Sequence, residues 1–259
     1  MVFSGSLSEF LAPFSPPQLG PSGAMPVRGV TADSRAVVPG VVFVAIRGSQ
    51  VDGHRHVAEA LAKGALLAIV ENPTGMLSEW VVPSTRALLA TLAARWFGDP
   101  TTAFPVVGIT GTAGKTTTTF LLTQAWEALG LRTALVGTVE TRVAGEIQAS
   151  SLTTPDALTL QSVFRRAADR GVERAAIEVS SIALDQHRVD GTRFACVAFT
   201  NLTQDHLDYH GTMERYGAAK ARLFSDFGAP VAVVNADDPF LPTLRRAANP
   251  NVRFETFSL

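Results

Sequence analysis

Residues 111–117 read Gly-Thr-Ala-Gly-Lys-Thr-Thr, and these residue types at this spacing suit the binding of a nucleotide's phosphates. Glycines let backbone N–H groups approach phosphate oxygens, and a helix that begins at such a loop adds partial positive charge. Lys115 can bridge the β- and γ-phosphates, and Thr116 can offer its hydroxyl to Mg²⁺. Ile109 stands where the strict Gly-x4-Gly-Lys-Ser/Thr spacing requires a glycine, so a Gly/Thr-rich turn that opens an ordinary helix remains the alternative. We expect ATP to be held by Gly111, Thr112, Ala113, Gly114, Lys115, Thr116 and Thr117.

Three more candidates for chemistry are a carboxylate, Glu178, an imidazole, His206, and an amine, Lys220. A carboxylate and a neutral imidazole beside a phosphate loop could serve Mg²⁺, although histidine is an unusual ligand for so hard an ion. Residue type alone leaves other readings open. Glu178 could equally form a surface ion pair, His206 could be a solvated loop histidine, and Lys220 taken alone is more typical of a solvated helix position.

The elements that must position these residues alternate between strand and helix along the chain. After residue 103 we expect strands at 106–110, 133–136, 175–179, 194–200, 231–235 and 252–257, and helices at 116–129, 157–170 and 213–224. Leu121, Ala125 and Leu129 are expected on the buried face of the first of these helices. This alternation predicts a doubly wound, mostly parallel α/β sheet, whose ligands bind beyond the carboxyl ends of the strands.

The same alternation begins earlier, so the sequence predicts a smaller α/β domain before the larger one. Strands are expected at 41–46 and 65–70, with helices at 56–63 and from about Thr85, capped by Ser84, to Phe97. The turn residues around Pro100 favour a boundary there. The expected division is an irregular lead-in over 1–26, an N-terminal domain over 27–102, and a central ATP-binding domain over 103–259.

Composition limits the partners and the compartment. The formal net charge is −1, and a nucleic-acid or anionic-membrane surface would need a basic excess. No segment reaches the roughly 18 consecutive apolar residues that a membrane span requires. The N-terminus has no basic stretch leading into an apolar one, as a signal peptide would. We therefore expect a soluble, cytoplasmic protein without nucleic-acid or membrane partners.

Several motifs in one order resemble the Mur ligase family, and its MurE type in particular, from about Val27 to the end of the chain. These motifs are Gly111–Thr117, Thr153-Thr154-Pro155-Asp156-Ala157, Glu178-Val179-Ser180-Ser181, Gln186-His187-Arg188 and Asn201 through Lys220. The resemblance implies an ATP- and Mg²⁺-dependent ligase of peptidoglycan synthesis. Such an enzyme adds meso-diaminopimelate or L-lysine to UDP-N-acetylmuramoyl-L-alanyl-D-glutamate through an acyl phosphate.

Carried onto this sequence, the resemblance implies catalytic roles for Lys115, Glu178, His206 and Lys220. Lys115 would hold the transferring phosphate, Thr116 and Glu178 would hold one Mg²⁺, and His206 would help to hold a second. Lys220 would become a carbamate, an anionic oxygen ligand for the metal. The UDP end of the substrate would be held by Ser34, Ser49, Gln50 and Val51. The muramoyl-dipeptide would be held by Thr153, Thr154, Ser180, Gln186 and Arg188.

The sequence departs from the family pattern at Ala113, where asparagine is usual, at Ile182, where histidine is common, and at Glu140, where glycine often stands. The resemblance also implies a C-terminal domain that carries the amino-acid pocket, which this sequence lacks and a separate chain could supply. One alternative is therefore a module that binds ATP or the UDP-sugar peptide without turnover. Another is a related ligase, such as a folylpolyglutamate synthase or a MurF- or MurC-like enzyme. The Thr153–Asp156 and Gln186–Arg188 motifs favour the MurE type.

Overall fold

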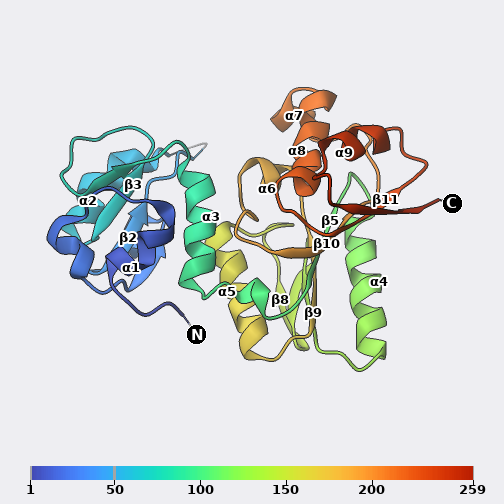
Figure 1. Cartoon of the computed structure of the whole chain (residues 1–259), viewed down its shortest axis with the longest axis horizontal. Coiled ribbons are helices and arrows are strands. Elements are labelled where there is room, and N and C mark those ends of the chain that lie inside the picture. The colour runs from blue at the N-terminus through green and yellow to red at the C-terminus, as the bar shows by residue number, and fades with distance from the viewer. Residues whose placement is uncertain (1, 49–50, 259) are drawn as a thin grey trace. The chain divides into compact units, whose positions relative to one another are not determined.

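The computed structural model describes residues 2–48 and 51–258, and the chain forms two compact units, Met1–Asp99 and Pro100–Leu259 (Figure 1). Each unit has its own sheet with helices packed on it. The expected α/β class, a small domain followed by a larger and mostly parallel sheet, is confirmed. None of the helices in the described ranges is long and apolar enough to cross a membrane.

The first unit is built on a four-stranded parallel sheet in the order β1-β2-β3-β4. Its strands are β1 (Gly29–Thr31), β2 (Val41–Val44), β3 (Leu67–Val70) and β4 (Glu79–Val81), and its longer helices are α2 (Val57–Ala62) and α3 (Thr85–Trp96). Every residue of β2 and β3 is buried, as expected for apolar strands covered on both faces. The Ser84 side chain accepts a hydrogen bond from the Ala87 amide, so the predicted cap of α3 is confirmed.

The expectation of an irregular segment over residues 1–26 was wrong in part. Leu7–Leu11 forms the short helix α1, and Ser6 and Glu9 close a reciprocal capping box at its start. Its apolar side chains, including Leu7 and Phe10, are fully buried. Burial against the rest of the unit stabilises this helix. With five residues among many Pro, Ser and Gly, it is too short to show a helical periodicity in the sequence.

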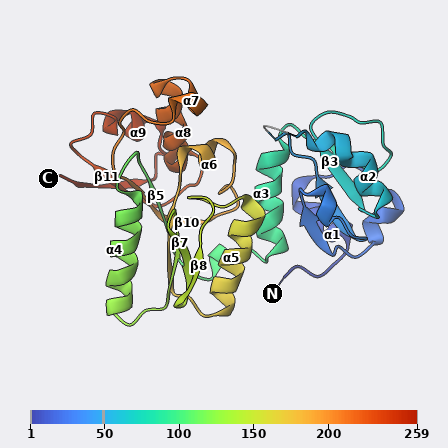
Figure 2. The ribbon, with the colours of Figure 1, turned by 180° about the vertical axis from the view of Figure 1, so that it is seen from behind.

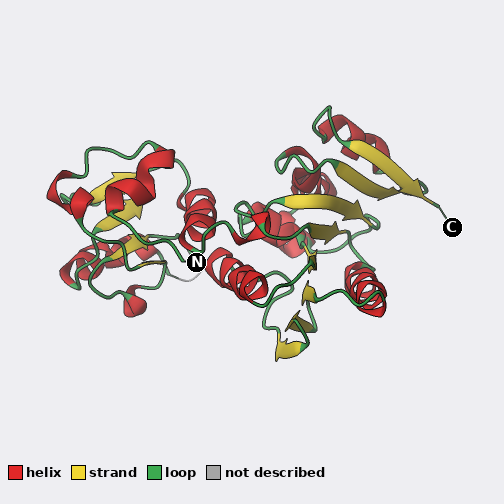
Figure 3. Ribbon diagram, turned by 60° about the horizontal axis from the view of Figure 1, so that its bottom comes forward, coloured by secondary structure: helices red, strands yellow, loops and turns green. Residues whose placement is uncertain are grey.

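The second unit contains an eight-stranded sheet in the order β12-β11-β10-β5-β9-β6-β7-β8. Figure 3 shows strands of the chain in yellow with the helices around them in red. The strands are β5 (Val106–Thr110), β6 (Thr133–Val136), β7 (Glu140–Val143), β8 (Glu146–Ala149), β9 (Arg174–Glu178), β10 (Phe194–Phe199), β11 (Val231–Asn235) and β12 (Arg253–Phe257). The pairings from β12 through β6 are parallel, and β6, β7 and β8 continue the sheet antiparallel. All six predicted strands are present, whereas the hairpin of β7 and β8 was not predicted.

Helices cover both faces of this sheet, with α4 and α5 on opposite sides of it (Figures 1 and 2). The helices are α4 (Lys115–Ala128), α5 (Ala157–Asp169), α6 (Ser181–Asp185), α7 (Leu207–His210), α8 (Met213–Ser225) and α9 (Leu241–Ala247). The core holds Leu160 and Phe164 of α5 and Leu223 and Phe224 of α8 against the strands. This packing fixes the loops that follow the strands at one rim.

The buried face predicted for α4 was wrong. Leu121 is 62% exposed and Leu129 is 76% exposed, whereas Thr119 and Thr123 are fully buried. The Thr123 hydroxyl donates to the Thr119 carbonyl at 2.9 Å, which satisfies the polar atom within the helix. Because the hydroxyls are satisfied in this way, α4 can bury threonine side chains. The spacing of its leucines therefore predicts the wrong face of the helix as the buried one.

Candidate active site

The glycine-rich loop connects β5 to α4, and its two glycines have backbone conformations that other residues rarely adopt. Gly111 has a φ of 149°, and Gly114, at the N-cap of α4, has a φ of 87°. A Cβ atom on Gly111 would lie 1.8 Å from the Thr200 hydroxyl oxygen, so a side chain is excluded there. No side chain caps the N-terminus of α4. The amides of its first turn are therefore available to an anion, as a phosphate site requires.

The residues that follow β10 hold the loop in shape. The Ala113 amide donates to the Asn201 side-chain oxygen at 3.0 Å, and the Asn201 side-chain nitrogen donates to the Ala113 carbonyl at 3.1 Å. The Thr200 hydroxyl donates to the same carbonyl at 2.6 Å. Sequence reasoning gave Asn201 no role of its own. The available signal was its position directly after a strand, at the rim that carries the loop.

Glu178 ends β9 with its side chain fully buried, so the surface ion pair considered for it is excluded. Its carboxylate accepts hydrogen bonds from the Thr116 hydroxyl at 2.8 Å, the Thr138 amide at 2.9 Å and the Thr138 hydroxyl at 3.0 Å. These bonds offset the cost of burying the charge. They also join the phosphate loop to the end of β6. Thr138 was not predicted, although it too follows a strand at this rim.

Lys115 and Lys220 approach the loop from α4 and α8. The Lys115 amine donates to the carbonyls of Gly111 at 2.8 Å and Thr112 at 2.9 Å, and the Lys220 amine donates to Gly111 at 2.8 Å. Lys220 is 1% exposed and its nitrogen lies 4.4 Å from the ring centre of Tyr216, so the solvated-helix reading is wrong. Burial, with a smaller contribution from the charge of Lys115, lowers the pKa of Lys220 to about 7.

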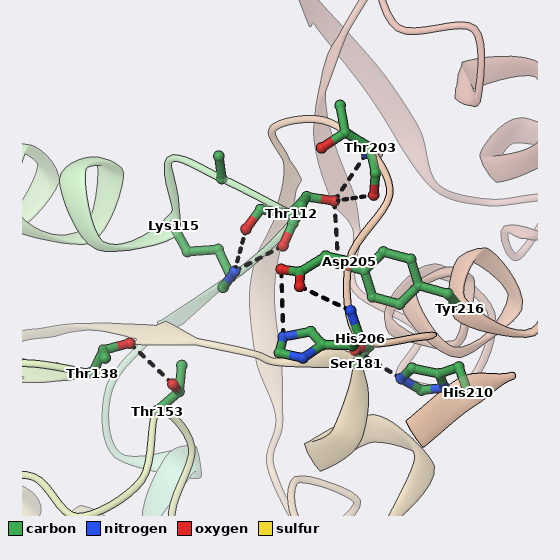
Figure 4. Close-up of polar contacts among 12 residues, drawn as sticks. Thr112, Lys115, Thr138, Thr153, Ser181, Thr203, Asp205, His206, His210 and Tyr216 are labelled. Carbon is green, nitrogen blue, oxygen red and sulfur yellow. Dashed lines mark hydrogen bonds and ion pairs between the residues drawn. The ribbon is translucent and has the colours of Figure 1, made fainter. Parts of the chain in front are cut away.

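His206 lies at the start of α7 with a positive φ of 51° and a side chain that is 45% exposed. Its ring nitrogen is 3.6 Å from the Asp205 carboxylate and its ring meets that of Tyr216 edge-on (Figure 4). Asp205 was not predicted, yet its charge acts on both lysines and raises the pKa of each against the effect of burial. The sequence feature that could have indicated Asp205 is its position directly before His206.

The residues present suit a Mg²⁺ ion beside the loop. The Thr116 hydroxyl oxygen and a Glu178 carboxylate oxygen lie 2.8 Å apart, and both are oxygen ligands of the kind that Mg²⁺ prefers. Within residues 2–48 and 51–258, no group of three or more His, Cys, Asp or Glu side chains could hold a metal by itself. Such an ion would therefore complete its shell with phosphate oxygens and water, which is how Mg²⁺ is commonly held at nucleotides.

The five residues expected to hold the muramoyl-dipeptide lie in one hydrogen-bonded group next to Glu178. The Thr153 and Thr138 hydroxyl oxygens lie at hydrogen-bond distance, 3.0 Å, and the Thr154 hydroxyl donates to the Glu178 carbonyl at 2.8 Å. The Ser180 amide donates to Thr154 at 3.1 Å, and an Arg188 nitrogen donates to the Thr154 carbonyl at 2.8 Å. Gln186 accepts two further bonds from Arg188. The structure thus brings these five side chains together.

The residues expected to hold the UDP end belong to the N-terminal unit. Ser34 opens a short 3-10 helix, and its carbonyl accepts a hydrogen bond from Lys63 at 2.9 Å. Val51 is 59% exposed. Ser49 and Gln50 lie outside the described residues.

The unusual residues leave the hydrogen-bonded framework in place. Ala113 has an exposed side chain, and its backbone makes the contacts with Asn201. Ile182 is half-buried on α6. Glu140 pairs with Arg142 at 2.8 Å on β7. Each departure therefore affects a side chain that the loop geometry does not use.

Both units of the chain match models of the Mur ligase family. Residues 109–259 match the Mur ligase middle domain, and residues 26–96 match the model described as Mur ligase family, catalytic domain. A relative from Xylella fastidiosa, UDP-N-acetylmuramoyl-L-alanyl-D-glutamate–2,6-diaminopimelate ligase, is 45% identical over 83% of this chain and 44% of its own length. A solved structure with that enzyme name matches with a TM-score of 0.85 and 32% identity, covering 100% of this chain and 53% of that one.

A more distant solved structure, MurF from Acinetobacter baumannii, has a TM-score of 0.62 at 20% identity and covers 99% of this chain and 53% of that one. That likeness concerns the fold alone. The chain spans about half the length of the curated relatives that it matches.

Proposed function

The chain belongs to the Mur ligase family, and from this premise we propose that it binds ATP and the UDP-sugar dipeptide in a ligase of cytoplasmic peptidoglycan synthesis. The proposed reaction joins a diamino acid to the D-glutamate of UDP-N-acetylmuramoyl-L-alanyl-D-glutamate. The names of the relatives favour 2,6-diaminopimelate over L-lysine. One observation carries the proposal: Thr116 of the phosphate loop meets the buried Glu178, while Lys220 contacts the carbonyl of Gly111 in the same loop.

The chemistry requires activation, because a carboxylate resists attack by an amine. Transfer of the terminal phosphoryl group of ATP to a carboxylate oxygen gives an acyl phosphate and ADP. The nitrogen of the amino acid then attacks the acyl carbon, and the tetrahedral intermediate expels phosphate as the C–N bond is retained. The amine loses a proton in this step. The protein must therefore stabilise phosphate charge and exclude water from the acyl phosphate.

Lys115 and the first-turn amides of α4 are the groups that would stabilise the phosphates. Burial lowers the pKa of Lys115 below its usual value, and the charges of Glu178 and Asp205 offset only part of that shift. Its amine now donates to two loop carbonyls. A phosphate oxygen offers a stronger, charge-assisted acceptor, so Lys115 would exchange one of these bonds for the nucleotide.

Thr116 and Glu178 would hold one Mg²⁺, and His206 with the carbamate form of Lys220 would hold a second. When bound, Mg²⁺ neutralises phosphate charge and favours transfer to an oxygen acceptor. A carbamate forms only on a neutral amine, and a Lys220 pKa of about 7 leaves a neutral fraction near neutral pH. His206 is exposed enough to reach a ligand at the rim.

Substrate recognition would be divided between the two units. Thr153, Thr154, Ser180, Gln186 and Arg188 would hold the muramoyl-dipeptide, with Arg188 offering the charge that suits a carboxylate. Ser34, Ser49, Gln50 and Val51 would hold the UDP end. The amino-acid substrate would be positioned by a C-terminal domain, which a separate chain could supply.

Calorimetric titration tests the binding half of the proposal. We expect the chain to bind ATP with Mg²⁺ and, separately, UDP-N-acetylmuramoyl-L-alanyl-D-glutamate. Absence of both would contradict the assignment. Phosphate release is then measured with the dipeptide and diaminopimelate, for the chain alone and with a separately expressed C-terminal half of a diaminopimelate ligase. Binding of both ligands with no release in either mixture would instead favour the module that binds without turnover.

A further inference from the structure

The hydroxyl of Tyr209, on α7, joins two residues of the α6 segment. It donates to the Asp185 carboxylate at 2.7 Å and accepts from the Gln186 side-chain nitrogen at 3.2 Å. A phenol carries one proton and a carboxylate only accepts, so the direction of both bonds is fixed. The lone pair of the Tyr209 oxygen faces the Gln186 amide nitrogen as a result.

This direction sets the orientation of the Gln186 amide. With its nitrogen on Tyr209, the Gln186 oxygen accepts from the Arg188 Nε at 3.2 Å and from its Nη2 at 2.8 Å. A guanidinium has donors only, so the opposite amide orientation would set donor against donor. Arg188 is held at its other end by the Thr154 carbonyl, at 2.8 Å.

We infer that Tyr209 is a positioning residue: its hydroxyl fixes the Gln186 amide and, through it, the guanidinium of Arg188 toward the dipeptide. The inference rests on the proposed function, in which Gln186 and Arg188 grip that substrate. Without the hydroxyl, the Gln186 amide nitrogen loses this acceptor, and the side chain that accepts from the guanidinium is held less firmly. The dipeptide then has to order these side chains when it binds, and the entropy lost in doing so lowers its affinity.

The surroundings of Tyr209 make removal of its hydroxyl a clean change. The side chain is 40% exposed and borders a cavity of about 430 Å³ that Asp185 also lines. Phenylalanine therefore opens no void in the core. A second bond ties α7 to α6, because the His210 ring nitrogen lies 3.0 Å from the Ser181 hydroxyl, with both side chains buried (Figure 4). This bond keeps the helix docked when Tyr209 changes.

The test is calorimetric titration of Tyr209→Phe with UDP-N-acetylmuramoyl-L-alanyl-D-glutamate and with ATP and Mg²⁺. We expect the dipeptide to bind about tenfold more weakly, with unchanged ATP affinity. Asp185→Asn is the matched variant. It keeps an oxygen that accepts the Tyr209 proton, so it should weaken the dipeptide by less than about threefold. In an Arg188→Lys background, Tyr209→Phe should have little further effect, because the anchored guanidinium is already gone.

The outcomes separate the inference from the proposed function. Equal dipeptide affinity in Tyr209→Phe and the wild type would overturn the inference and leave the proposed function standing. Loss of ATP binding as well would make Tyr209 a structural residue and also overturn it. Full additivity with Arg188→Lys would do the same. A wild-type chain that binds ATP but no dipeptide would remove the proposed function, and the inference with it.

Discussion

The amines of Lys115 and Lys220 donate to one acceptor, the carbonyl oxygen of Gly111, each at 2.8 Å. Two ammonium groups so close and so buried repel each other, which favours loss of a proton from one of them. Lys220 is the more buried and has a pKa of about 7. The arrangement therefore assigns the lasting positive charge to Lys115 and the neutral amine to Lys220.

The first prediction concerns pH and stability. The pKa of Lys220 is about 7 in the folded chain and ordinarily 10.5, so between these values the unfolded chain binds more protons. The free energy of unfolding of the wild type should therefore rise as the pH increases from about 7 toward about 10, and the full penalty of the buried charge remains below about 7. Lys220→Met removes this contribution.

Urea unfolding in buffers free of carbon dioxide measures the effect. Lys220→Met should gain most over the wild type near pH 7, and its advantage should shrink by about pH 9. A difference that stays constant over this range would show that Lys220 does not titrate there.

A second prediction concerns the close approach at Gly111. Gly111→Ala places a methyl group 1.8 Å from the Thr200 hydroxyl oxygen in a backbone conformation that favours glycine. We expect it to destabilise the chain by about 2 kcal/mol or more and to abolish ATP binding. Gly130→Ala is the control. Gly130 has a φ of 80° with nothing within 4 Å, so that variant suffers backbone strain alone, about 1 kcal/mol, and keeps ATP affinity.

Thermal unfolding and ATP titration of the two variants decide the point. Equal losses of stability in Gly111→Ala and Gly130→Ala would mean that the contact with Thr200 is relieved by a small shift of the loop.

Much of the site follows from the sequence because parallel strands bring their carboxyl ends to one rim. Glu178 ends β9, and Asn201 and the segment that carries His206 follow β10. The strand assignments alone therefore predict that these residues lie near the loop. Lys220 is different. Nothing in its local sequence indicates burial, which arises when α8 packs beside β5.

Two other features could not be read from local patterns. The two strands of the β7–β8 hairpin are short and mostly polar, and every residue of β8 is exposed, so no buried apolar run marks the hairpin in the sequence. The inward face of α4 was misassigned because Thr119 and Thr123 satisfy their hydroxyls within the helix. Hydropathy counts a threonine as polar whether or not its hydroxyl is already paired.

A third prediction separates the metal contribution from nucleotide binding. Thr116→Val keeps the volume of the side chain and removes the hydroxyl that meets Glu178. It should weaken ATP binding about tenfold in the presence of Mg²⁺ and little in its absence. Thr123→Val makes the same change on the same helix away from the loop, so it should leave both affinities unchanged. Titration with and without Mg²⁺ gives the comparison, and equal weakening in both conditions would contradict a metal role for Thr116.

The last prediction asks whether the backbone or the side chain of residue 113 matters to the loop. Asn201 holds both the amide and the carbonyl of Ala113, whereas the Ala113 side chain is exposed. Asn201→Ala should therefore weaken ATP binding about tenfold, because the loop amides lose their fixed orientation. Ala113→Asn, which introduces the residue usual in the family, should change that affinity by less than about threefold, since the backbone contacts persist. Titration of both variants measures this, and a large gain from Ala113→Asn would instead mean that the side chain at 113 contributes directly to phosphate binding.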